Sequence, residues 1–367
     1  MHGKGIFAQK VHHPALVIKI GSNVLARPDG SLNLSLLRSL VRQITSIRQA
    51  GYNVLLVSSG AVTAGRKNVN PLPKTDTVTQ RQVLAAVGQA QLMQVYTKLF
   101  GKHETTCAQI LVTKEDFRSR RHYLNIRNCL TGILQHSVFP IINENDVVSV
   151  TELMFTDNDE LAGLLASMMN AQRLIILTNV DGIYDQPPSQ PGAQLLQQIT
   201  PNQPLEAQIS AEKSDFGRGG MRTKSRIARK LANLGVAVHI ANGSTPGVLE
   251  KIIADKSVGT HFLPKKKASP IKRWLGQSED AQKGSIHVNE GAYQALTQPE
   301  RATSLLMVGV IQVDGNFAKS EVVQLKYKNE VFGLGKTYYS AAQARELMGQ
   351  AGKKPIIHYD HLYLDGN

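Results

Sequence analysis

Apolar residues in the first two thirds of the chain follow two alternating spacings. Short aliphatic and β-branched runs, each suited to one buried strand, alternate with longer runs whose apolar positions recur every three or four residues. Residues 34–50 show the second spacing, with Leu37, Leu40, Ile44 and Ile47 on one helical face. Strands that alternate with helices in this way predict βαβ units around a mainly parallel sheet.

We therefore predict an α/β fold, an αβα sandwich with a mainly parallel central sheet. The expected strands are 15–20, 52–57, 106–112, 138–143, 174–178 and 237–240, and the expected helices are 34–50, 80–100, 123–135, 161–169 and 221–233. Residues 185–203 are rich in Pro and Gln, which predicts an exposed excursion rather than core.

The pattern changes after residue 260. Short alternating runs at 285–288, 307–313 and 322–325 are separated by Gly-containing turns, which predicts a small β-rich domain with little helix. A basic, Pro-bounded stretch precedes it and resembles a linker. We therefore divide the chain into a disordered leader (1–13), a first domain (14–263), a basic linker (264–283) and a second domain (284–367).

Composition and charge narrow the classes of function. The chain has 367 residues, 42% of them hydrophobic, and a formal net charge of +14. This charge favours an anionic partner, such as a nucleotide, a nucleic acid or a membrane surface. Residues 284–367 carry eight basic and eight acidic side chains, so the whole excess lies before them. No apolar run approaches the roughly 20 residues of a membrane span, and the N-terminus has no apolar signal region.

The two cysteines, Cys107 and Cys129, favour free, buried thiols and a reducing, cytoplasmic compartment.

Two predicted strands end in glycine-containing polar turns. Lys19 is followed by Gly21 and Ser22, and the next strand runs into Ser58-Ser-Gly60. Ligands of α/β sheets bind at the carboxyl ends of the strands, where glycine lets backbone amides approach phosphate oxygens. A lysine that extends from an edge strand to solvent, and ordinary loops, would explain the same residues.

A third segment, Gly217-Arg-Gly-Gly-Met-Arg-Thr-Lys224, precedes a predicted helix. The positive end of a helix dipole favours an anion, and Lys224 in the first turn is unfavourable unless an anion is bound there. Glycine-rich loops are common, so this segment alone is weak support for phosphate binding.

Polar clusters follow two further elements. Asn143-Glu-Asn-Asp146 closes a predicted strand, and Asp157, Asn158 and Asp159 begin a predicted helix. Helix capping accounts for one of the three residues at 157–159, and the rest suit a site for a small ionic substrate.

In this order, the segments resemble the amino-acid kinase family, in particular its glutamate 5-kinase branch. The resemblance spans about residues 15–260. The matching pieces are Val17-Ile-Lys-Ile-Gly-Ser, Val57-Ser-Ser-Gly-Ala, Leu84-Ala-Ala-Val-Gly-Gln89, Ile142-Asn-Glu-Asn-Asp146, Asp157-Asn-Asp159, Leu177-Thr-Asn-Val-Asp-Gly-Ile-Tyr184 and Gly219-Gly-Met-Arg-Thr-Lys224. The tail resembles a PUA domain through Ile286-His-Val-Asn-Glu-Gly-Ala292, Ser304-Leu-Leu306 and Gly315-Asn-Phe317.

The resemblance implies ATP-dependent phosphorylation of the γ-carboxylate of L-glutamate to L-glutamyl 5-phosphate, for proline biosynthesis. It implies catalytic roles for Lys19, Lys224 and Asp159, and glutamate binding by Ser59, Asp146 and Asn158. The implied ATP site comprises Lys19, Gly21, Ser22, Thr178, Asn179, Arg218, Gly219, Gly220, Met221 and Lys224. Mg²⁺ would bridge the nucleotide phosphates with few or no direct protein ligands. The family also implies feedback inhibition by proline, a homodimer or homotetramer, and glutamyl phosphate reductase as a partner.

Three residues depart from the family pattern. Asn179 stands where Asp is frequent, Arg218 where a small residue is usual, and Thr156 where Gly is frequent. Because of them, the sequence does not define the nucleotide contacts of Asn179, the contacts of Arg218 in the glycine loop, or the shape of the loop beside Asn158.

Two other functions remain open from the sequence. The same fold could act on aspartate, N-acetylglutamate, a nucleoside monophosphate such as UMP, or isopentenyl phosphate. A PUA domain could instead indicate an RNA-binding protein, but nucleic-acid affinity requires surplus Lys and Arg, and residues 284–367 are neutral. We therefore expect no nucleic-acid partner and no membrane association.

Overall fold

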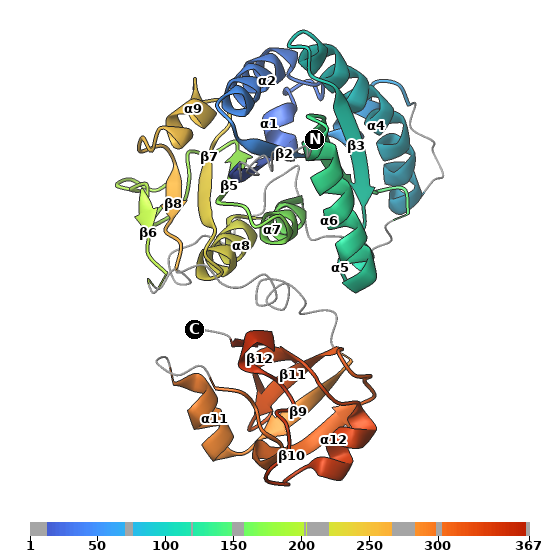
Figure 1. Cartoon of the computed structure of the whole chain (residues 1–367). Coiled ribbons are helices and arrows are strands. Elements are labelled where there is room, and N and C mark those ends of the chain that lie inside the picture. The colour runs from blue at the N-terminus through green and yellow to red at the C-terminus, as the bar shows by residue number, and fades with distance from the viewer. Residues whose placement is uncertain are drawn as a thin grey trace, which may run out of the picture.

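The computed structural model describes residues 13–69, 76–118, 120–148, 158–201, 203, 220–265, 283–298 and 303–364. These residues form two sheets, each with its own helices and its own buried core (Figure 1). Almost all of the predicted leader and of the predicted linker lies outside the described residues.

The first sheet has eight strands in the order β3-β4-β2-β1-β5-β7-β8-β6. Their bounds are β1 Ala15–Ile20, β2 Asn53–Ser58, β3 Cys107–Val112, β4 Phe139–Glu144, β5 Arg173–Thr178, β6 Gln198–Ile199, β7 Ala237–Asn242 and β8 Thr260–Phe262. Strands β3, β4, β2, β1, β5 and β7 are parallel to one another. Strand β8 pairs antiparallel with β7, and β6 pairs parallel with β8. Within the parallel part, β1, β2, β4, β5 and β7 are buried on both faces, which explains their nearly continuous apolar runs, whereas the edge strand β3 is half-exposed.

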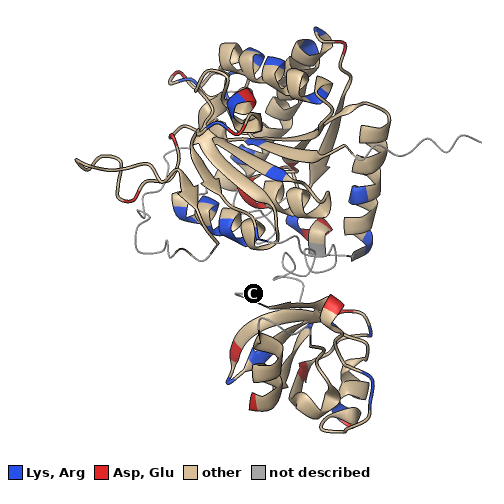
Figure 2. Cartoon of the chain, turned by 60° about the vertical axis from the view of Figure 1, so that its left-hand side comes forward, with Lys and Arg blue, Asp and Glu red and all other residues tan. Residues whose placement is uncertain are grey.

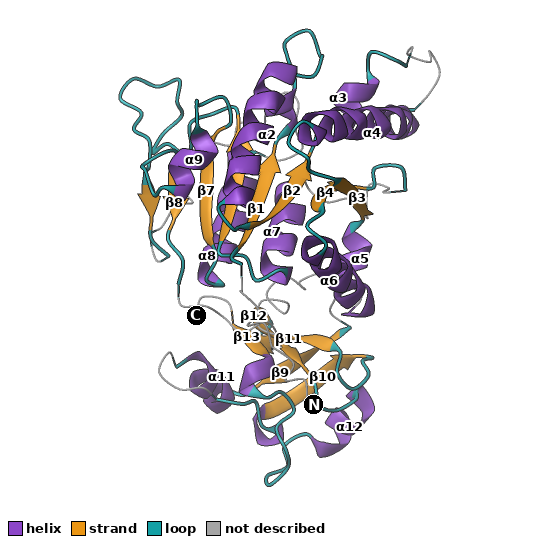
Figure 3. Cartoon of the chain, turned by 45° about the horizontal axis from the view of Figure 1, so that its top comes forward, coloured by secondary structure: helices purple, strands orange, loops and turns teal. Residues whose placement is uncertain are grey.

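Helices cover both faces of this sheet (Figures 1 and 3). One core lies beneath α2 (Leu34–Gln49), α4 (Thr77–Gly101) and α9 (Val248–Ile253), and the other beneath α6 (Arg120–Gln135), α7 (Asn158–Met168) and α8 (Met221–Asn233). Alternate residues of β1 serve the two cores: Leu16 and Ile18 face the first, and Val17 faces the second. Lys19 therefore points toward α7 and α8. The predicted αβα sandwich is confirmed.

The major predicted elements are present, with bounds shifted by up to three residues; strand 15–20 and helix 221–233 agree at both ends. The sequence reading missed four short helices because none spans two turns: α1 Ser22–Leu25, α3 Ala61–Gly65, α5 Lys114–Arg118 and α9. It also missed β8. The predicted exposed excursion 185–203 is wrong at Ile199, which lies in β6 and is buried against the core.

The second domain is a five-stranded sheet in the order β10-β9-β11-β12-β13. Its strands are β9 Gly284–Val288, β10 Val310–Gly315, β11 Val322–Tyr327, β12 Glu330–Lys336 and β13 Leu362–Leu364. The expectation of little helix is wrong, because α11 (Glu290–Thr297) and α12 (Ala341–Leu347) help to enclose its core. Asn289 caps α11, and a Ser340/Gln343 capping box begins α12. Residues 307–309, predicted as strand, form a 3₁₀ turn before β10.

Candidate functional site

Three buried charged residues meet at the carboxyl end of the first sheet. Lys19 extends from β1, and its Nζ lies 2.6 Å from Oδ1 of Asp159, at the second position of α7. The Nζ of Lys224, in the first turn of α8, lies 2.9 Å from Oδ2 of the same carboxylate. The side chain of Asp159 is fully buried and those of both lysines nearly so. One carboxylate thus holds two ammonium groups, and the three residues together carry a net positive charge.

This arrangement follows from the alternation along β1 and the helical period of α8. Lys19 shares the face of Val17, against which α7 packs. Lys224 occupies the buried face of α8 with Ile227, Ala228 and Leu231. A charge is costly to bury unless it is paired, and Asp159 supplies a partner to both lysines.

The predicted nucleotide residues lie at the ends of neighbouring strands. Gly21 follows β1, and its N–H donates to the carbonyl of Leu177 at 3.1 Å, so its backbone joins β1 to the end of β5. A Cβ at Gly21 would lie 3.2 Å from that carbonyl and 3.6 Å from Nζ of Lys19. Glycine therefore keeps the space beside the lysine open. Ser22 begins α1, while Thr178 ends β5 and its hydroxyl contacts Asn179.

The glycine-rich segment before α8 is described only from Gly220. Gly220 occupies the N-cap position in an extended conformation, with no side-chain cap, and Met221 begins the helix. The positive end of the α8 dipole thus lies next to Lys224, where it favours an anion. Arg218 and Gly219 lie outside the described residues, as do Asp157 and Thr156.

A second polar group lies at the ends of β2 and β4. The Asn158 side-chain N–H₂ donates to Oγ of Ser59 at 2.9 Å and to Oδ1 of Asn143 at 2.9 Å. Gly60 has φ of 105°, a left-handed conformation that suits glycine, and it turns the chain sharply after Ser59. The structure thus brings Ser59 and Asn158 together from segments 99 residues apart.

The third predicted substrate residue, Asp146, makes a different contact. Its carboxylate pairs with Arg81 of α4 at 3.1 Å. In the next residue, the carbonyl of Val147 accepts from the Gln82 side chain at 2.8 Å. Helix α4 therefore holds the loop after β4 that carries Asp146.

Sequence reasoning passed over Asn143 and Gln89 as site residues. Asn143 is 3% exposed, and its Nδ2 donates to Oε1 of Gln89 at 2.9 Å. Both residues stood inside the quoted motifs, so a signal was present. Their hydrogen bond could not be predicted, because β4 and α4 are far apart in sequence and meet only in the folded chain.

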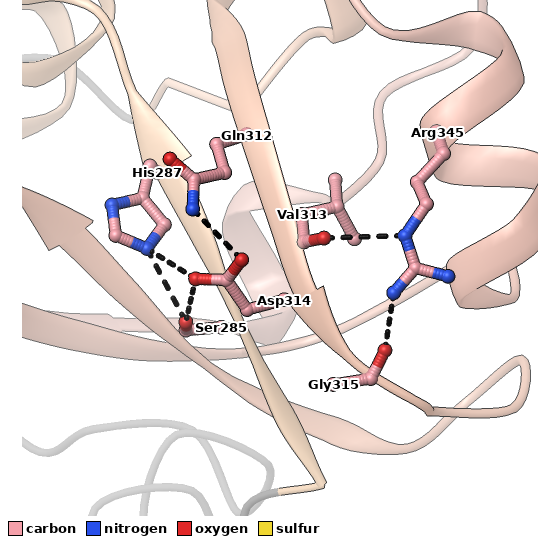
Figure 4. A network of polar contacts seen from close by, with 7 residues as sticks. All are labelled: Ser285, His287, Gln312, Val313, Asp314, Gly315 and Arg345. Atoms are coloured by element: carbon pink, nitrogen blue, oxygen red, sulfur yellow. Dashed lines mark hydrogen bonds and ion pairs between the residues drawn. The ribbon is translucent and has the colours of Figure 1, made fainter.

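A separate polar cluster lies in the second domain (Figure 4). Nε2 of His287 lies 2.8 Å from Asp314 and 3.5 Å from the Ser285 hydroxyl, and Gln312 donates to the other Asp314 oxygen at 2.8 Å. Hydrogen bonds from Gln312 and then from His287 lower the pKa of Asp314. The hydrolytic triad needs a histidine that uses one ring nitrogen for serine and the other for aspartate. Here the same nitrogen faces both, so the cluster ties β9 to β10.

The charges divide between the domains as the sequence predicted. Figure 2 shows Lys and Arg on several helices of the first domain and both signs interspersed on the second. Both cysteines are free, as expected, although Cys129 is exposed. Across the described ranges, no helix is long and apolar enough to cross a membrane. No three His, Cys, Asp or Glu side chains among those ranges gather into a group that could hold a metal ion.

Comparison with known proteins assigns both domains. The model of the amino acid kinase family matches residues 14–242, and that of the PUA domain matches residues 284–359. Glutamate 5-kinases of Bacteroides thetaiotaomicron and Chlorobaculum tepidum are each 48% identical to this chain, over 95% and 96% of its length respectively and 98% of theirs.

Solved structures share the fold of the first domain. Carbamate kinase from Giardia lamblia bound to AMP-PNP matches with a TM-score of 0.50 at 20% identity, over 69% of this chain and 99% of that one. An isopentenyl phosphate kinase substrate complex matches with a TM-score of 0.50 at 17% identity, over 67% of this chain and 99% of that one. From the family models and the near full-length relatives, we conclude that the chain belongs to the amino acid kinase family, among the glutamate 5-kinases, and carries a PUA domain.

Proposed function

We propose that this chain transfers the γ-phosphoryl group of ATP to the γ-carboxylate of L-glutamate, giving L-glutamyl 5-phosphate, the first step of proline biosynthesis. The observation that carries the proposal is the pair of lysines held by Asp159. Lys19 and Lys224 reach one point from β1 and α8, and their ammonium groups suit the oxygens of a phosphoryl group in transit. The names of the relatives support glutamate as the acceptor.

The reaction requires little acid–base catalysis from the protein. A γ-carboxylate is ionised at neutral pH and can attack phosphorus without losing a proton. Asp159 therefore orients the two ammonium groups and takes no proton. Lys19 and Lys224 neutralise the charge on the phosphoryl oxygens, and the positive end of the α8 dipole adds to this.

ATP would lie over the ends of β1, β5 and α8. Gly21, Ser22, Thr178, Asn179, Gly220 and Met221 would line its site, together with Arg218 and Gly219. Mg²⁺ would arrive with the nucleotide, held mainly by phosphate oxygens, and would supply further charge neutralisation. The fit is chemical, because the described residues here offer ammonium and backbone N–H groups, which bind phosphate rather than metal.

Glutamate would bind at Ser59 and Asn158, with Asp146 in the loop that α4 holds. Proline, which has an ammonium group next to a carboxylate as glutamate does, would compete for these groups. A cytoplasmic homodimer or homotetramer and coupling to glutamyl phosphate reductase are further proposals that rest on the resemblance to the family.

The test is release of ADP from ATP and Mg²⁺ with L-glutamate, L-aspartate, N-acetyl-L-glutamate or UMP, with hydroxylamine present to trap an acyl phosphate. Hydroxamate with glutamate alone, suppressed by proline, is the expected result. Turnover only with another acceptor would assign the chain a different substrate without changing the fold. No release of ADP with any of the four acceptors would refute the proposal.

A further inference from the structure

A chain of side-chain amides runs from α4 to the proposed substrate site. Oε1 of Gln89 accepts from Nδ2 of Asn143 at 2.9 Å, and Oδ1 of Asn143 accepts from Nδ2 of Asn158 at 2.9 Å. The same Asn158 nitrogen donates to Oγ of Ser59 at 2.9 Å. We infer that Gln89 is a positioning residue that, through Asn143, presents the Asn158 carbonyl to the substrate's α-ammonium group and so selects free amino acids. The inference rests on the proposed function.

The direction of every bond in this chain is set by one backbone group. An amide can rotate by 180° and exchange its oxygen and nitrogen, so its orientation must come from its partners. The backbone N–H of Glu144 can only donate, and it lies 2.9 Å from the Asn143 amide. That contact makes the Asn143 atom Oδ1. Its other end is then Nδ2, which faces Oε1 of Gln89, and the Asn158 atom facing Oδ1 must be Nδ2.

This polarity leaves one acceptor for a ligand. Asn158 uses its N–H₂ group on Ser59 and Asn143, and its Oδ1 is buried with no hydrogen-bond partner among the described residues. A buried acceptor without a partner is unfavourable, so a ligand N–H group is the natural occupant. Ser59 already accepts from Asn158, and its own proton is available to a carboxylate. An acceptor beside a donor matches the ammonium and carboxylate of an amino acid.

Gln89 keeps its position because α3 and α4 approach closely. A Cβ on the adjacent Gly88 would overlap the carbonyl of Ala61, and one on Gly65 would overlap that of Leu84. The two helices meet at these glycines, directly after the turn that carries Ser59. Gln89 and Asn143 lie on the same side of the sheet, since β4 directs Phe139 and Ile141 toward α4. Gln89 therefore acts through Asn143 rather than by direct contact with substrate.

The test compares Gln89→Met, which removes the acceptor at similar volume, with Gln89→Glu, which keeps one. L-Glutamate and glutarate, which lacks the amino group, serve as acceptors. A hydrogen bond to a charged group contributes enough to change affinity by roughly tenfold or more when it is lost. We expect Gln89→Met to raise the KM for L-glutamate by about tenfold, with kcat, the KM for ATP and kcat/KM for glutarate within about twofold. Gln89→Glu should restore the KM for L-glutamate.

Loss of activity toward both acceptors in equal measure, an unchanged KM in Gln89→Met, or a Gln89→Glu variant that behaves like Gln89→Met would each overturn the inference. Thermal stabilisation by L-glutamate and by glutarate is measured alongside and separates the two proposals. A wild-type chain stabilised by L-glutamate but not by glutarate, without turnover, would refute the proposed kinase activity and support the amino-group selection. A wild-type chain with neither binding nor turnover would refute both.

Discussion

Removing Asp159 should cost far more stability than removing one of the lysines it holds. Asp159→Asn leaves two buried ammonium groups, previously 2.6 and 2.9 Å from the carboxylate, without its charge. Loss of one partner from a buried ion pair costs about 3–5 kcal/mol. Lys224→Met removes one ammonium and leaves Lys19 and Asp159 as a neutral pair. We therefore expect Lys224→Met to lower the free energy of unfolding by less than Asp159→Asn does.

Lys224→Met should lower activity far more than it lowers stability. Loss of one preorganised charge from a transition-state site typically lowers kcat by about 10²–10³. Lys224→Met should reach that loss with only a small rise in the KM for glutamate, because the lysine stabilises the moving phosphoryl group. Urea unfolding at pH 7.5 without ligands, and steady-state kinetics, measure the two quantities on the same preparations.

The double variant Asp159→Asn/Lys224→Met provides the decisive comparison. It retains one unpaired ammonium, so it should be more stable than Asp159→Asn alone, with a coupling energy of about 0.5–3 kcal/mol. Additive losses, or near-normal turnover in Lys224→Met, would refute the reasoning that one carboxylate organises both lysines.

Three other predictions concern positions outside that site. His239 is buried and stacks on His261, with ring centroids 4.0 Å apart, and burial lowers its pKa to about 3. The unfolded chain therefore binds a proton at this histidine more readily than the folded chain. The free energy of unfolding is highest above about pH 6.5 and falls by about 2 kcal/mol between pH 7.5 and 5.0. His239→Phe should flatten this pH dependence in urea unfolding, and an unchanged slope would contradict the prediction. Gly88→Ala should destabilise by about 1–3 kcal/mol and raise the KM for glutamate, because the added methyl forces α4 away from α3; wild-type values for both would contradict the close approach. Burial raises the pKa of the Cys107 thiol to about 11, whereas Cys129 is exposed; iodoacetamide at pH 8 should label Cys129 first, as peptide mass mapping can check.

The sequence predicted the fold class because strand and helix spacings are local properties. Residues 15–20 form a nearly continuous apolar run, and residues 221–233 place apolar residues at helical spacing, so each segment defines an element alone. Helices α1, α3 and α9 were missed because they have four to six residues, too few for a period to show. The buried Ile199 was missed for another reason: its pairing partner, Phe262, lies far along the chain.

The candidate site was also predicted only in part. Lys19 and Lys224 predicted phosphate binding from their places at a strand end and a helix start, whereas the role of Asp159 beside them was implied only by the resemblance to the family. That one carboxylate holds both lysines could not be read, because it depends on β1, α7 and α8 meeting on one side of the sheet.

Local residue patterns alone define which segments form strands and helices and which of their ends carry charged and polar groups. The tertiary structure alone decided which of those groups meet and in what orientation. The amide chain from Gln89 to Ser59 joins α4, β4, α7 and the turn after β2, and the backbone N–H of Glu144 sets its polarity. Spacing along the chain contains no information about such contacts, because hydrogen bonds extend only about 3 Å and depend on how the elements pack.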